Sequence, residues 1–142
     1  MTTRLFFALS FLALIIWSHG CQNSTESIVQ QPQGLIGSWG WVESGGGELG
    51  LRTPESEGYT ENWRFDPDST FYEYRNDTLV YQGTYEIRQD RVGPWMLDTA
   101  DVLAIRFYDR YWQWAVRFSG KDTLILTLLA FDAGYSKFVR KK

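Results

Sequence analysis

The side chains of this 142-residue sequence that could carry chemistry are mainly carboxylates and aromatic rings. The single histidine, His19, and the single cysteine, Cys21, both stand at the end of an apolar N-terminal segment. Once that segment is removed, no histidine remains for a Ser-His-Asp triad, for a Cys-His pair or for an ordinary zinc, haem or copper site. We therefore expect no cofactor and no bound metal, and the sequence argues against most enzyme classes.

Two glutamates fall within rows of alternating aromatic residues. Glu61 is in phase with Trp63, and Glu73 is in phase with Phe71. If these rows face the interior, both carboxylates, together with Arg106, are buried charges that need partners. Polar groups in an apolar cup commonly orient a ligand. The alternatives are an internal Glu–Arg pair, an outward-facing surface, or a pair of glycosidase-type carboxylates.

Aromatic residues make up 17% of the chain, and most of them lie in strand-like segments, which points to an all-β domain. The segment Tyr111-Trp112-Gln113-Trp114 could stack a sugar ring or an apolar ligand, or its two tryptophans could pack in the core. The residues that we expect to line a ligand cup are Glu61, Trp63, Phe65, Glu73, Tyr81, Tyr85, Ile105, Phe107, Trp112 and Trp114.

Alternation with period two runs through most of the sequence from residue 35 onward. It predicts eight strands, over residues 35–42, 59–65, 70–75, 79–88, 102–108, 111–119, 123–129 and 135–140. Two connections are long: residues 89–101, and residues 43–58, which contain Gly45-Gly46-Gly47 and resemble a lid or Ω-loop. Gly83, in the middle of the fourth strand, indicates a bulge or a sharp bend.

The fold class that this pattern predicts is all-β, an eight-stranded antiparallel up-and-down barrel. Eight sequential strands without a helical segment form a meander, and closure of the meander removes its exposed edges. The interior of such a barrel is filled by side chains or holds one small ligand. An open sandwich is the alternative. Most of the strands are shorter than the about 9–11 residues of a transmembrane strand, and their outward faces are polar.

The first 20 residues have the composition of a signal peptide. Arg4 precedes an apolar run over residues 5–17, which is shorter than the about 20 residues of a transmembrane helix. Cys21 follows directly after Gly20 and resembles the acceptor cysteine of bacterial lipoproteins, which implies acylation with palmitate-type chains. Ordinary secretion and an uncleaved anchor helix are the alternatives. Residues 21–34 are polar and predict a lipid-anchored flexible linker before a domain over residues 35–142.

The two ends of this domain match a known pattern. Gly37-Ser38-Trp39 matches the Gly-x-Trp that opens the first strand of lipocalins, and Arg140 stands where lipocalins often place an arginine. Over residues 35–140 the chain resembles the small lipocalin-like lipoproteins of Bacteroidetes-type bacteria. That likeness is carried by Gly37-x-Trp39-x-Trp41, Thr53-Pro54-Glu55-Ser56-x-Gly58-Tyr59-Thr60, Tyr74-x-x-x-x-Leu79-Val80-x-x-Gly83-x-Tyr85, Asp122-Thr123-Leu124-x-Leu126 and Gly134-Tyr135-x-x-x-Val139-Arg140. The resemblance implies a barrel in the cell envelope and structural roles for Gly37, Trp39 and Arg140, with Trp39 plugging the closed end under the Arg140 side chain.

Removal of the signal leaves 13 Lys and Arg against 17 Asp and Glu, a formal net charge of −4. A mildly acidic domain of this kind is not expected to bind nucleic acid. We expect a monomer that a lipid holds in the bacterial cell envelope. The outer membrane is favoured because Gln22-Asn23 lacks the Asp that retains some lipoproteins in the inner membrane. The expected function is binding of a small apolar or amphipathic ligand, with residues 43–58 as a lid. The alternative is a filled barrel that serves as a structural, protein-interaction or inhibitor module.

Overall fold

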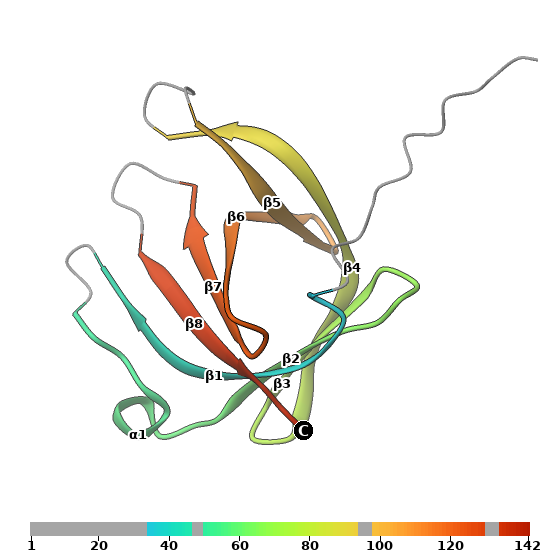
Figure 1. Ribbon diagram of the computed structural model, residues 1–142. Coiled ribbons are helices and arrows are strands. Elements are labelled where there is room, and N and C mark those ends of the chain that lie inside the picture. The colour runs from blue at the N-terminus through green and yellow to red at the C-terminus, as the bar shows by residue number, and fades with distance from the viewer. Residues whose placement is uncertain (1–33, 47–49, 94–97, 130–133) are drawn as a thin grey trace, which may run out of the picture.

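The computed structural model describes residues 34–46, 50–93, 98–129 and 134–142, which form a closed antiparallel barrel of eight strands (Figure 1). The strands follow one another around the barrel in sequence order, so the predicted up-and-down barrel is confirmed. The elements are β1 (Gly37–Gly45), α1 (Pro54–Glu57), β2 (Glu61–Phe65), β3 (Thr70–Arg75), β4 (Thr78–Val92), β5 (Asp98–Phe107), β6 (Arg110–Ser119), β7 (Thr123–Leu128) and β8 (Tyr135–Arg140). The predicted signal peptide, Cys21 and the linker up to residue 33 lie outside the described residues.

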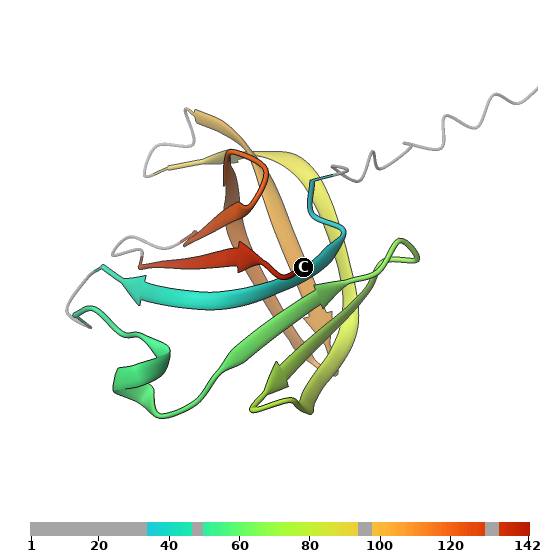
Figure 2. The same ribbon diagram turned by 60° about the horizontal axis from the view of Figure 1, so that its bottom comes forward.

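The barrel has two different ends, which follow from the alternating strand directions. The closed end holds the start of β1, the end of β8 and the turns after β2 and β6. The opposite end, which we call the mouth, holds the connection between β1 and β2 and the turns after β3 and β5. Figure 2 shows α1 at the rim of the barrel, in the connection that leads from the end of β1 to the start of β2.

Trp39 lies near the start of β1, where the resemblance implies a plug of the closed end. Its side chain is fully buried, and its indole N–H donates a hydrogen bond to the carbonyl of Leu35 at 2.7 Å. The guanidinium carbon of Arg140 lies 4.2 Å from the centre of the Trp39 ring. A Cβ at Gly37 would stand 2.8 Å from Nη1 of Arg140, and the φ of Gly37 is +126°, so glycine leaves room for this contact. These residues are structural.

Aromatic rings fill the barrel from the closed end to its middle. The ring centroid of Trp63 lies 4.7 Å from that of Phe138, 5.1 Å from that of Phe71 and 5.6 Å from that of Trp114. Phe65 packs against Phe71 at 5.3 Å. This part of the interior is a packed core. All eight strands and this core lie within residues 34–142, so the segment contains the elements of a self-contained domain.

The register of β4 with β3 shifts at Val80, three residues before the position predicted at Gly83. Gly83 itself stands at the corner where β4 passes from its pairing with β3 to its pairing with β5. The part of β4 before this corner pairs with β3 up to Thr84, and the part after it pairs with β5 from Thr84 onward. A Cβ at Gly83 would stand 2.2 Å from the backbone oxygen of Arg106. Only glycine allows the two strands to approach this closely.

Two features of the fold differ from the sequence-based expectations. The segment 89–101 was expected to be a loop, but β4 extends into it to Val92 and β5 begins in it at Asp98, and the two strands pair from Gln89–Asp101 to Val92–Asp98. The side chains of these paired residues are mostly polar and exposed, so the two strands extend beyond the barrel as a polar arm that no hydrophobic pattern indicated. The expectation that the chain has no helical segment was also wrong, because the short helix α1 begins at a capping box formed by Thr53 and Ser56.

Candidate functional site

Three charged side chains meet at the mouth, and we call Glu61, Glu73 and Arg75 the mouth cluster; the two glutamates are mostly buried, and Arg75 is exposed. The pairing of β2 with β3 places Glu61 opposite Arg75 and Trp63 opposite Glu73. Nη2 of Arg75 lies 3.9 Å from Oε2 of Glu61 and 3.6 Å from Oε1 of Glu73. The indole N–H of Trp63 donates a hydrogen bond to Oε1 of Glu61 at 2.7 Å. The expected inward phase of both glutamates is therefore present.

Burial and mutual repulsion alter the acidity of the two carboxyl groups. Glu73 is only 8% exposed, and burial, together with the charge of Glu61, raises its pKa to about 7, while Arg75 opposes the shift. Burial also raises the pKa of Glu61, against the lowering effects of the Trp63 hydrogen bond and of Arg75. The cluster therefore exchanges a proton near neutral pH.

Aromatic side chains lie beside the mouth cluster and on strands further around the barrel. Tyr81 on β4 pairs with Glu73, and its ring stacks on that of Phe107 at 4.9 Å. On β6 the rings of Trp112 and Trp114 stack at 6.1 Å with an interplanar angle of 13°. Trp112 belongs to the same inward row as Trp114, yet it is 43% exposed. The ring of Trp112 is therefore accessible to solvent at the mouth.

A small cavity lies at the mouth, where the end of β1 and the connection after it face strands β6 to β8. Its volume is about 150 Å³, and its lining includes Ser44, Arg52, Trp114, Leu126 and Leu128. The cavity is smaller than the few hundred Å³ of a typical site for a drug-sized ligand. Trp114 links it to the mouth cluster, because this ring both lines the cavity and packs against Trp63.

The connection between β1 and β2 forms one wall of this cavity. Backbone hydrogen bonds of 2.9 and 2.8 Å join Ser44 with Arg52, and an ion pair of 2.8 Å joins Arg52 with Glu57. Further along, the ring of Tyr59 stacks on that of Trp41 at 5.9 Å. The described part of the connection is thus attached to the barrel at both of its ends.

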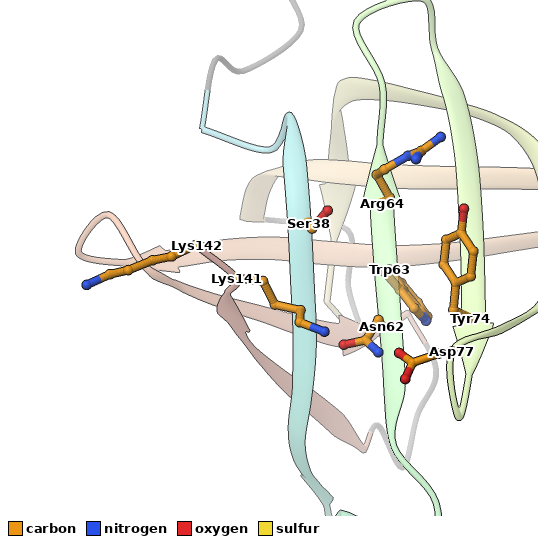
Figure 3. A pocket seen from close by; sticks show the side chains of 8 residues that line it. All are labelled: Ser38, Asn62, Trp63, Arg64, Tyr74, Asp77, Lys141 and Lys142. Carbon is orange, nitrogen blue, oxygen red and sulfur yellow. The ribbon is translucent and has the colours of Figure 1, made fainter.

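A depression of about 460 Å³ lies outside the barrel, over β1 to β3 and the C-terminus (Figure 3). Its lining includes Asn62, Arg64, Asp77 and Lys141. Arg64 is already engaged, because Asp66 lies 3.1 Å from its Nε and the ring of Tyr72 lies 4.3 Å below its guanidinium carbon. No sequence pattern pointed to this groove, and its polar, open lining does not favour an apolar ligand.

The structure brings together only some of the residues expected in the cup. Glu61, Trp63 and Glu73 are neighbours, as are Tyr81 with Phe107 and Trp112 with Trp114. Phe65, Tyr85 and Ile105 instead belong to the buried core. The phenol of Tyr85 donates to the carbonyl of Asp66 at 2.9 Å, in the turn after β2 at the closed end.

The expectation that Arg106 is a buried charge was wrong, and several residues at the mouth were not expected there. Arg106 is exposed on the outer face, where its guanidinium carbon lies 5.6 Å from the centre of the Tyr111 ring. It alternates with the inward Phe107, and this alternation was the signal against burial. Arg75 was not counted among the site residues although it shares the phase of Glu73, and no pattern indicated Ser44 or Arg52.

The described residues contain no group of three or more His, Cys, Asp or Glu side chains that could hold a metal ion. Within the same ranges, no helix has the length and apolar character needed to cross a membrane.

The barrel and its mouth are consistent with a lipocalin-like fold. The chain matches no family model, no curated protein and no solved structure with significance.

Proposed function

We propose that this chain is a lipocalin-like lipoprotein of the bacterial cell envelope that binds a small amphipathic ligand in the mouth of its barrel. The observation that carries the proposal is the position of Trp112, an inward-row tryptophan that is 43% exposed. A large apolar ring that faces an open interior is available to a ligand, and the mouth cluster supplies polar groups that orient it. The ligand is small or only partly enclosed, because the other half of the barrel is packed.

A test of ligand binding uses the segment 22–142, exported to a bacterial periplasm behind a cleavable signal and measured by native mass spectrometry. We expect a small co-purifying mass that is lost in Trp112→Ala. Tyr72→Ala, which removes an aromatic ring on the outer face of β3, is the matched control and should retain the mass. A protein that carries no ligand and takes up none from an envelope lipid extract would refute the proposal.

The membrane location depends on Cys21. We expect the full chain to incorporate labelled palmitate and to fractionate with the outer membrane. Cys21→Ser should abolish both the label and the membrane association. Incorporation of label into the Cys21→Ser chain, or a wild-type chain that is entirely soluble, would contradict lipid anchoring.

A second candidate function is a protein-interaction module, which the hairpin between β5 and β6 favours. Tyr108 is 93% exposed with a φ of +52°, and the neighbouring Tyr111 is 46% exposed. Exposed aromatic residues of this kind are typical of interaction sites. A photo-crosslinker placed at Tyr108 in intact cells distinguishes the two functions, because a single protein adduct that persists in Trp114→Ala would support interaction without ligand binding.

A further inference from the structure

We propose that the ligand is a small amphipathic cation, with its charged group at the carboxylates of Glu61 and Glu73 and its apolar body against Trp114. This inference rests on the ligand-binding function proposed above and specifies the chemical class of the ligand.

The charge balance of the mouth favours a cation. Two carboxylates, Glu61 and Glu73, share one guanidinium, that of Arg75, at 3.9 and 3.6 Å. The nearby guanidinium of Arg52 is already neutralised, because its Nε and Nη2 donate to the carboxylate of Glu57 at 3.0 and 2.8 Å. An anionic ligand would meet two carboxylates against one shared cation, whereas a cationic ligand would complete the charge balance.

The carboxylate of Glu73 is mostly buried, and one guanidinium lies near it. It is 8% exposed, faces the interior between Trp63 and Tyr81, and accepts no hydrogen bond from any residue that the structure describes. Its closest cationic atom is Nη2 of Arg75, at 3.6 Å. Burial of a carboxylate favours a charged partner close to it, and an ammonium group would bring both a charge and hydrogen-bond donors.

Aromatic rings next to the carboxylates suit a cation as well. The mouth already contains one cation–π contact, since the guanidinium carbon of Arg75 lies 4.4 Å from the centre of the Tyr59 ring. Tyr81 and Trp114 offer further rings beside Glu73 and Trp63. Carboxylates combined with aromatic faces recognise organic ammonium ions better than either group alone.

The cavity beside Trp114 limits the size of the apolar part. Its volume is about 150 Å³, and its lining combines the apolar Trp114, Leu126 and Leu128 with polar residues that include Ser44, Arg52 and Ser136. An engineered apolar cavity of about this volume in another protein binds benzene. A single aromatic ring or a short alkyl chain therefore matches the space, and benzylammonium is a suitable probe.

The cluster also predicts a pH dependence of binding. The groups that face Glu73 are Glu61 from β2, Arg75 from its own strand and Tyr81 from β4, with Tyr59 and Arg52 in the connection after β1. Because the pKa of Glu73 is raised to about 7, its negative charge develops between pH 6 and pH 8. Affinity for a permanently protonated ligand should rise about tenfold over this interval.

The experiment is isothermal titration calorimetry of the segment 22–142 with three probes that share one ring: benzylammonium, benzyl alcohol and benzoate. At pH 8 we expect benzylammonium to bind at least about tenfold more tightly than either other probe. In Glu73→Gln this preference and its pH dependence should vanish, while benzyl alcohol binds as before. Glu86→Gln, on the exposed outer face of β4, is the matched control and should behave as wild type.

The outcomes separate this inference from the function on which it rests. Equal binding of benzyl alcohol and benzylammonium would leave ligand binding intact and overturn cation selectivity. Tighter binding of benzoate would do the same and would place the recognition at Arg75. If no probe binds although native mass spectrometry detects a co-purified ligand, the cation inference fails and the proposed function stands. If no ligand is detected either, both fail. Thermal unfolding of each variant verifies that the barrel is folded.

Discussion

The indole N–H of Trp63 donates a hydrogen bond of 2.7 Å to Oε1 of Glu61, so a ring of the packed core positions a carboxylate at the mouth. The same ring packs against Phe71, Trp114 and Phe138. The position of a charged group at the open end therefore depends on the aromatic packing below it. Changes in the core should alter the mouth, and changes in the charge of the mouth should alter the stability of the core.

Trp63→Phe should reduce the free energy of unfolding by about 2–4 kcal/mol. The change removes the hydrogen bond to the partly buried carboxylate of Glu61 and leaves space in the core. Urea denaturation at pH 7 measures this loss. Trp112→Phe is the control, because Trp112 is half-exposed, and it should change stability by less than about 1 kcal/mol. A smaller loss in Trp63→Phe than in Trp112→Phe would contradict the role of the indole N–H.

The stability of the barrel should decrease as pH rises from about 4.5 to 7. The pKa of Glu73 is raised from 4.5 to about 7, so the folded state binds more protons than the unfolded state over this interval. Loss of those protons therefore costs stability, up to about 3 kcal/mol for this group. Urea denaturation of wild type and Glu73→Gln at pH 4.5 and pH 8 isolates the effect.

The variant Glu73→Gln should be more stable than wild type at pH 8 and should gain little at pH 4.5, where Glu73 is already protonated in the folded state. A wild-type chain that loses more stability than the variant as pH falls from 8 to 4.5 would show that Glu73 is stabilised as a carboxylate.

Gly83→Ala should destabilise the barrel by about 3 kcal/mol or more, because the new Cβ would stand 2.2 Å from the backbone oxygen of Arg106. Gly40→Ala is the matched control in β1. Its Cβ would meet nothing closer than Asn62 Oδ1 at 3.5 Å, so its effect should stay within about 1 kcal/mol. Thermal unfolding compares the two variants. Equal midpoints would mean that the corner of β4 tolerates a side chain.

Arg140→Met should reduce stability by about 1–3 kcal/mol. It removes the cation–π contact with Trp39 and the hydrogen bond from Nη1 to the carbonyl of Ile36 at 2.9 Å. Lys141→Met, at the exposed neighbouring position, should leave the unfolding midpoint unchanged. If both substitutions have the same effect, the contribution of Arg140 is general surface charge and not contact with Trp39.

The rows of inward residues could be predicted from the sequence because side chains alternate strictly along a strand. Glu61 with Trp63, and Glu73 with Phe71, share their faces in the barrel as the alternation indicates. The same rule, applied more strictly, places Arg106 outside because it follows the inward Ile105. Alternation did not reveal the polar arm of β4 and β5, because neither face of that arm is covered by a core.

The sequence by itself determined the number of strands, their order and the face of most side chains, because each of these follows from local alternation and turn residues. Only the tertiary structure decided the depth of each side chain. Phe65 and Trp112 both lie in inward rows, yet one is fully buried and the other is half-exposed at the mouth. Depth depends on the stagger of neighbouring strands around the closed barrel, and that stagger is a property of the whole sheet.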